Sequence, residues 1–143
     1  MANIVPDSFK TDLLGGVFDF DSSGGSTFKL ALYSDISSFS TSTTAYTTTN
    51  EVSSSGTNYT AGGNTLTNNG VSVGSNIAFV DFADLTFSSV TLTAAGALIY
   101  KDTSNEAVLV LDFGGSKTAT NGDFVIQFPT ADSSNAIIRL GDA

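Results

Sequence analysis

Apolar and polar residues alternate with a period of two along much of the chain, and this pattern is typical of half-buried β-strands. Residues 28–33, which place Phe28, Leu30 and Leu32 on one face, show it clearly. Other runs are apolar on both faces, as expected for strands that are buried from two sides. Together the strand-like runs occupy residues 28–33, 77–82, 85–92, 97–100, 107–113, 124–128 and 136–140. They predict an all-β domain.

Turn-forming residues separate these runs. Asn69-Gly70 and Asn121-Gly122 are dipeptides typical of tight hairpin turns, and residues 101–106 form a polar turn between two apolar runs. The alternation slips by one residue at Ser88-Ser89, which predicts a β-bulge. Short strands divided by such turns predict an antiparallel β-sandwich, jelly-roll-like in form, although the sequence does not distinguish a jelly roll from another Greek-key sandwich.

One helix is expected, near the amino terminus. Residues 6–16 contain the signals for it: Asp7 or Ser8 at the start and Gly15-Gly16 at the end. A helix of one or two turns is marginal alone in water, so it must pack against another surface.

The position of this helix divides the chain into an amino-terminal arm or short helix at residues 1–16 and a single β-sandwich domain at residues 17–143. Phe9 and Leu13 are four residues apart and share a face of the helix. Two alternatives remain open: the helix packs on its own domain, or it packs on a neighbouring subunit. In the second case Phe9, Leu13 and Leu14 are the predicted assembly contacts.

Residues 37–60, here called the Ser/Thr segment, have an unusual composition, because 15 of these 24 residues are Ser or Thr. A disordered linker is one interpretation, but Tyr46, Val52 and Tyr59 are spaced as if for burial. A mucin-like stalk is another, but the segment lacks Pro. Because Thr is β-branched and suits exposed strands, we favour an edge strand at residues 43–49, flanked by loops.

The charge of the chain argues against several partners. Five Lys and Arg residues against 14 Asp and Glu give a formal net charge of −9, the wrong sign for binding phosphates. We therefore expect no nucleic-acid partner and no membrane partner. No apolar run reaches the roughly 20 residues of a transmembrane helix. The amino terminus lacks the basic and apolar regions of a secretion signal, so synthesis in a cytoplasm is expected.

The residue types needed for most catalysis are missing. The chain has no Cys and no His, which excludes disulfides, thiolate or imidazole metal ligands, and Ser-His or Cys-His mechanisms. We therefore expect no catalytic residues, no cofactor-binding residues and no metal ligands, and we expect that the protein is not an enzyme.

Two pairs of carboxylates are the candidates for a metal or catalytic site. Asp19 and Asp21 could contribute oxygen ligands to calcium, but their spacing does not match a calcium-binding loop, and a solvated turn is the favoured interpretation. Asp81 and Asp84 could act as the acid and base of a glycoside hydrolase. Their three-residue spacing at a strand end favours hydrogen bonds to nearby backbone amides instead.

Several strings in order along the chain resemble a family of small virion proteins of tailed bacteriophages. They are Phe28-Lys-Leu-Ala-Leu-Tyr33, Ala45-Tyr-Thr-Thr-Thr-Asn-Glu-Val52, Tyr59-Thr-Ala-Gly-Gly63, Val80-Asp-Phe-Ala-Asp84, Gly96-Ala-Leu-Ile-Tyr100, Val110-Leu-Asp-Phe-Gly114 and Ala136-Ile-Ile-Arg139, with Asp7-Ser-Phe-Lys10 and Asp12-Leu-Leu14 before them. The chain departs from that pattern at Ala95, where the family often has Arg, and near Phe87, where it often has Trp.

The resemblance implies a non-enzymatic structural protein of the virion, with capsid cement or decoration as the leading function. Such a protein is made in the cytoplasm of the host bacterium and binds the major capsid protein on the capsid surface. It also forms a homo-oligomer, which we expect to be a trimer by analogy with other cement proteins. The alternative is a tail-associated protein or a protein that binds a receptor or glycan. The family supplies no catalytic residues.

Overall fold

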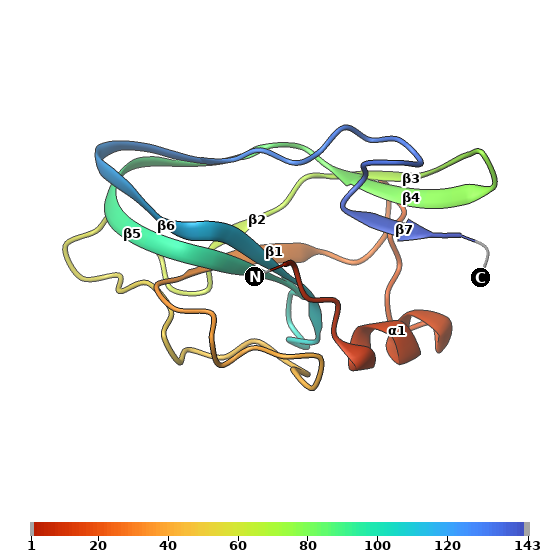
Figure 1. Ribbon diagram of the computed structural model, residues 1–143, viewed down its shortest axis with the longest axis horizontal. Helices are drawn as coiled ribbons and strands as arrows, with labels where there is room; N and C mark the ends of the chain where they lie inside the picture. The colour runs from red at the N-terminus through yellow and green to blue at the C-terminus, as the bar shows by residue number, and fades with distance from the viewer. Residues whose placement is uncertain (1, 142–143) are drawn as a thin grey trace.

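The computed structural model describes residues 2–141 and consists mostly of antiparallel β-strands with one short helix (Figure 1). The elements are α1 (Asp7–Leu14), β1 (Phe28–Tyr33), β2 (Asn64–Thr65), β3 (Asn68–Gly74), β4 (Ile77–Phe82), β5 (Leu85–Lys101), β6 (Ala107–Ile126) and β7 (Ile138–Leu140). The prediction of an all-β chain with a short amino-terminal helix is confirmed.

The strands form two antiparallel sheets. The first sheet has the order β2-β1-β5-β6, and the second has the order β3-β4-β7. The second sheet and α1 lie at the same end of the molecule (Figure 1). Sequence neighbours pair in the hairpins β3–β4 and β5–β6, whereas β1 reaches its partner β5 across a long separation in the chain.

β5 and β6 form one long, curved hairpin in which runs predicted as separate short strands are joined by bulges. The predicted bulge at Ser88-Ser89 is confirmed, since the pairing register shifts there and Ser89 has a φ of 54°. A larger bulge lies at residues 113–116, which stand opposite the single residue Ala95. Gly114 and Gly115 have φ values of 72° and 136°, a region that side chains strongly disfavour. These bulges bend the hairpin without ending it.

Two of the predicted hairpin turns are wrong. Asn69-Gly70 lies at a bulge inside β3, where Gly70 has a φ of 95°, and Asn121-Gly122 lies inside β6, where Asn121 has a φ of 46°. The β3–β4 turn is at Ser75-Asn76, with φ values of 50° and 64°. The polar turn at residues 101–106 is confirmed and connects β5 to β6. The dipeptide Asn-Gly indicates a residue with positive φ. Because β-bulges as well as tight turns contain such residues, the dipeptide alone does not distinguish the two.

The main core contains a group of phenylalanine rings between α1 and the two sheets. Phe20 and Phe28 stack with centroids 4.7 Å apart and nearly parallel planes. Phe18 and Phe82 pack around this pair. The rings tie the loop after α1 to β1 and β4, so the two sheets and the helix share one core.

A second core lies on the other face of the first sheet. Its buried members are Ala31, Tyr33, Ile36, Phe39, Leu98, Tyr100, Ala107 and Val110. The loop that begins after β1 covers this face, with Ile36 and Phe39 packed onto the strands. β1 is therefore buried from both sides, which explains why its sequence is apolar at nearly every position.

α1 starts differently from the prediction. Pro6 is its N-cap and no side chain caps the first turn, so neither Asp7 nor Ser8 has that role. The Ser8 hydroxyl instead donates to the Thr43 carbonyl, 3.1 Å away. At the other end Gly16 has a φ of 79°, as predicted for the left-handed residue after a helix.

Candidate functional site

The three predicted assembly residues of α1 lie in different environments. Phe9 is buried in the chain's own core and packs on Phe18 and Phe20, with ring centroids 5.1 and 6.1 Å away. Leu13 is partly buried against the same core. Leu14 is 82% exposed. α1 therefore packs on its own domain, and Leu14 is the residue of the three that is free for another molecule.

Leu14 lies at the same end of the molecule as an apolar face of the second sheet. Val71 and Val73 of β3 are 52% and 74% exposed, and Leu140 of β7 is 57% exposed. Val73 pairs with Ala78, and Ala78 pairs with Leu140, so these side chains lie on the same face of the sheet. We call Val71, Val73 and Leu140, together with Leu14 of α1 at the same end of the molecule, the apolar patch. Clustered exposure of large apolar side chains is typical of interaction surfaces.

A small cavity of about 120 Å³ lies where α1 meets this sheet. Leu13 and Phe20 line one side, and Val80, Ile138 and Leu140 line the other. The lining is almost entirely apolar, so the patch continues inward between the helix and the sheet.

The Ser/Thr segment is a loop, and the predicted edge strand at residues 43–49 is wrong. Its ladder contacts are isolated bridges, Ala45 to Glu106 and Glu51 to Tyr33. Local hydroxyl groups accept from several backbone amides of the segment, for example Thr43 Oγ1 from the Ser40 N–H at 3.0 Å. High β-propensity does not make a strand where no neighbouring edge is free to pair.

Glu51 fastens this loop to the first sheet. Its Oε2 accepts a hydrogen bond from the Tyr46 hydroxyl at 2.6 Å. Its Oε1 accepts from the Tyr59 hydroxyl at 2.8 Å and from the Gly62 N–H at 2.6 Å. The Tyr59 hydroxyl in turn accepts from the Leu32 N–H of β1 at 3.0 Å. One carboxylate thus connects two turns of the loop to a central strand.

The other two tyrosines complete the same anchor. The Tyr33 hydroxyl donates to the Thr47 carbonyl and the Tyr100 hydroxyl donates to the Gly62 carbonyl, both at 2.7 Å. Tyr46 stacks on Tyr100 with centroids 4.7 Å apart. Burial raises the pKa of Tyr100 to about 12 and also raises the pKa of Tyr33. These phenols are therefore held as neutral hydrogen-bond donors.

In the two candidate pairs, Asp19 with Asp21 and Asp81 with Asp84, carboxylates accept hydrogen bonds from backbone or side-chain amides. Asp19 Oδ1 accepts from the Asp21 N–H at 2.9 Å, which forms a local turn. Asp81 Oδ2 accepts from Asn69 Nδ2 at 2.7 Å, and Asp84 Oδ1 accepts from the Phe128 N–H at 2.8 Å. Within residues 2–141, three or more acidic side chains do not gather in an arrangement that would hold a metal ion.

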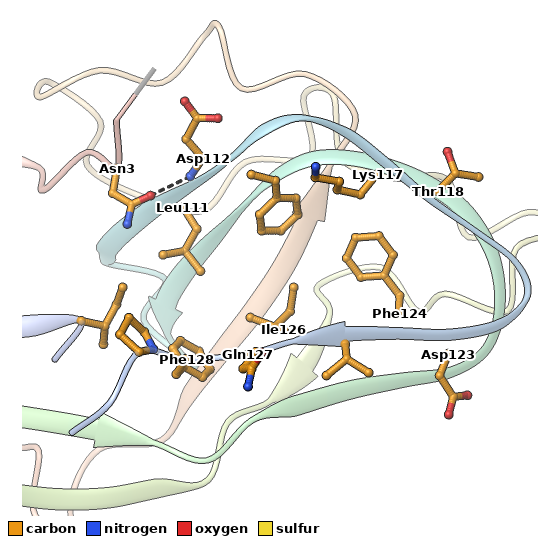
Figure 2. Close-up of a pocket in the computed structure, with 14 residues that line it drawn as sticks. Asn3, Leu111, Asp112, Lys117, Thr118, Asp123, Phe124, Ile126, Gln127 and Phe128 are labelled. Atoms are coloured by element: carbon orange, nitrogen blue, oxygen red, sulfur yellow. Dashed lines mark hydrogen bonds between the residues drawn. The ribbon is translucent and has the colours of Figure 1, made fainter. Parts of the chain in front are cut away.

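An open groove of about 470 Å³ lies between the two arms of β6, and we call it the β6 groove. Figure 2 shows Leu111, Phe124, Ile126 and Phe128 pointing into one space from opposite arms, while Asp123 points away from it. Its lining is Asn3, Leu111, Asp112, Phe113, Lys117, Thr118, Asp123, Phe124, Val125, Ile126, Gln127, Phe128, Pro129 and Ile137. An apolar floor with a few polar groups at the rim is the usual make-up of a binding site.

Sequence reasoning missed both the anchor and the groove. Glu51 is the only charged residue in the Ser/Thr segment, and that isolation was the available signal. The groove had no local signal, because it forms only when the bulge at residues 113–116 bends β6 back toward itself.

No protein-family model, curated protein or solved structure matches this chain. Among the described residues, α1 is the single helix, and it is too short and too polar to cross a membrane.

Proposed function

We propose that this protein is a non-enzymatic structural protein of a tailed-phage virion, most specifically a capsid cement or decoration protein. It would bind the major capsid protein on the capsid surface after synthesis in the host cytoplasm. The observation that carries the proposal is the apolar patch. Its exposed leucine and valine side chains leave water when another protein covers them, and this burial lowers the free energy of the complex. The ordered resemblance to small virion proteins supports the same function.

The fold is compatible with the proposed cement function. Two antiparallel sheets share a phenylalanine core, which favours the proposed jelly-roll-like sandwich. A shell also presents many copies of a binding surface, so contacts that are weak individually sum to strong attachment. Homo-oligomers, proposed as trimers by analogy with other cement proteins, would increase this effect.

The test is a pull-down of the purified chain with undecorated capsids, compared with isolated tails. We expect binding to capsids, and we expect Leu14→Ser to weaken it because this change removes an exposed apolar contact without touching the core. Val5→Ser is the matched control, since Val5 is partly exposed outside the patch. Binding to tails alone would overturn the cement proposal.

A tail-associated or glycan-binding role is the second candidate, and the surface of the Ser/Thr segment favours it. A shallow hollow of about 350 Å³ is lined there by Ser38, Phe39, Ser42, Thr43, Thr44, Ala45, Thr47 and Thr49. Hydroxyl groups can hydrogen-bond sugars, and the Glu51 anchor holds them in place. Binding on a glycan array that is lost with Thr47→Val and Ser42→Ala would favour this candidate, and an array without binding would exclude it.

A further inference from the structure

One wall of the β6 groove is the edge of a strand. Seven consecutive residues, 123–129, line that wall, and the first four of them belong to β6. Successive side chains of a strand point to opposite faces, so a consecutive lining means that the groove follows the backbone edge. β6 is the last strand of its sheet, and within residues 2–141 no strand pairs with its outer edge between residues 117 and 126. Unpaired backbone groups therefore lie beside an apolar floor.

The chain itself shows that the edge of β6 accepts an extended segment. Ile4 and Val110 exchange two backbone hydrogen bonds, each of 2.9 Å. Asn3 Oδ1 then accepts from the Asp112 N–H at 2.9 Å, at the point where the groove begins. The amino-terminal segment thus covers the edge of the first arm of β6, and the edge of the second arm is left open.

The charges at the rim select the chemistry of an occupant. Asp112 accepts from the Gly114 N–H at 2.8 Å, and Asp123 accepts from the Ser89 N–H at 3.2 Å. Both carboxylates are therefore engaged by backbone amides. The Lys117 ammonium makes no hydrogen bond or ion pair with any described residue. Lys117 is therefore the rim group that can pair with an acidic side chain of an occupant.

From these three observations we propose that the β6 groove binds an extended peptide segment of a partner protein, which adds to the edge of β6 at residues 123–126 as a further antiparallel or parallel strand. Alternate apolar side chains of the segment fill the floor near Phe124 and Ile126, and an acidic residue reaches Lys117. This recognition mode draws affinity from backbone hydrogen bonds and specificity from side-chain pockets. It goes beyond the proposed function and does not depend on it.

The test uses fluorescein-labelled synthetic peptides and the full-length chain, with no capsid present. The probe Thr-Ile-Thr-Phe-Thr-Val-Glu is amidated, and its controls are a scrambled peptide without alternation and a version with Lys in place of Glu. Two further versions carry N-methyl groups, one on each alternate set of amides. Only one set can face β6, so one N-methylated peptide should lose at least tenfold in affinity and the other should lose little.

Charge-reversed variants test the role of Lys117. We expect Lys117→Glu to reverse the preference of the protein from the Glu peptide to the Lys peptide, while Lys10→Glu, which changes net charge equally at a distant exposed site, leaves the preference intact. Binding should shift the amide resonances of Val125 and Gln127. The proposal is overturned if no peptide binds at 1 mM, if both N-methylated peptides bind as well as the parent, or if the shifts map to the apolar patch.

Discussion

Glu51 makes more long-range contacts than its place in a hydroxyl-rich loop would suggest. Its carboxylate accepts three hydrogen bonds, from Tyr46, Tyr59 and Gly62. Tyr59 is only 3% exposed, so its hydroxyl has no access to bulk water if the carboxylate is removed. The stability of the loop therefore depends on one acceptor.

We expect Glu51→Ala to lower the free energy of unfolding by about 1–3 kcal/mol, the usual cost of leaving a buried donor unsatisfied. Glu51→Gln should cost less, because the amide keeps one acceptor oxygen for Tyr59 or Tyr46. Urea unfolding followed by circular dichroism measures both. Asp35→Ala is the control, since Asp35 is exposed and bonds only to nearby Ser37. An Ala variant as stable as wild type would show that the loop does not depend on this anchor.

The buried tyrosines predict a loss of stability in alkaline solution. The pKa of Tyr100 rises from its ordinary value of 10.0 to about 12, mainly because of burial, so the folded state keeps a proton that the unfolded state releases. Stability from this group is complete below pH 10 and is lost as pH rises from 10 through 12. Absorbance at 295 nm should show late tyrosinate formation, and Tyr100→Phe should remove one late-titrating group. Titration of all four tyrosines near pH 10 would contradict the prediction.

At the scale of elements, the faces of the strands could be predicted and their ends could not. Alternation located β1 and the start of β5, because burial of one face constrains every second residue, and runs that are apolar on both faces located β4 and the part of the β5–β6 hairpin next to its turn. Strand ends depend on whether a positive φ is used in a turn or in a bulge, and Asn121-Gly122 carries the same local signal for either. Whether residues 43–49 form a strand or a loop depended on whether a sheet edge elsewhere in the chain was free to pair with them.

The candidate sites were less predictable than the strands. Leu14 could be named from the helix, but its exposure depends on which face of α1 meets the core. Glu51 and Tyr59 are eight residues apart, yet their meeting is determined by the path of a whole loop over β1. The β6 groove joins Leu111 to Phe124 across a bend that no local pattern reveals.

The large bulge in β6 leads to a test at this scale. Gly115 has a φ of 136°, where an added side chain is strained although no atom lies within 4 Å of the added carbon. We expect Gly115→Ala to destabilise the protein by about 1–3 kcal/mol. Gly122→Ala is the matched control on the same strand, because its added carbon meets only an ordinary contact of 3.6 Å to Thr120 O. Thermal unfolding compares the two, and equal midpoints would mean that the bulge adapts to a side chain.

At the scale of the whole molecule, two opposing terms govern association. A net charge of −9 makes copies of the chain repel one another, while the apolar patch favours contact. Added salt screens the repulsion, because the Debye length falls from about 10 Å at 0.1 M to about 3 Å at 1 M. The apolar contribution does not weaken under the same conditions. Self-association through the patch should therefore strengthen with salt.

Sedimentation velocity at 0.05 M and 0.5 M NaCl tests this balance. We expect the proposed homo-oligomer to be more populated at high salt. The double variant Leu14→Ser, Val73→Ser should reduce that population at least fivefold, because both substitutions remove exposed apolar surface that the contact would cover. Val5→Ser is the control, because Val5 is 39% exposed outside both the patch and the β6 groove. Equal loss in the control, or a monomer at every salt concentration, would separate the patch from self-assembly and leave binding to the capsid as its remaining proposed role.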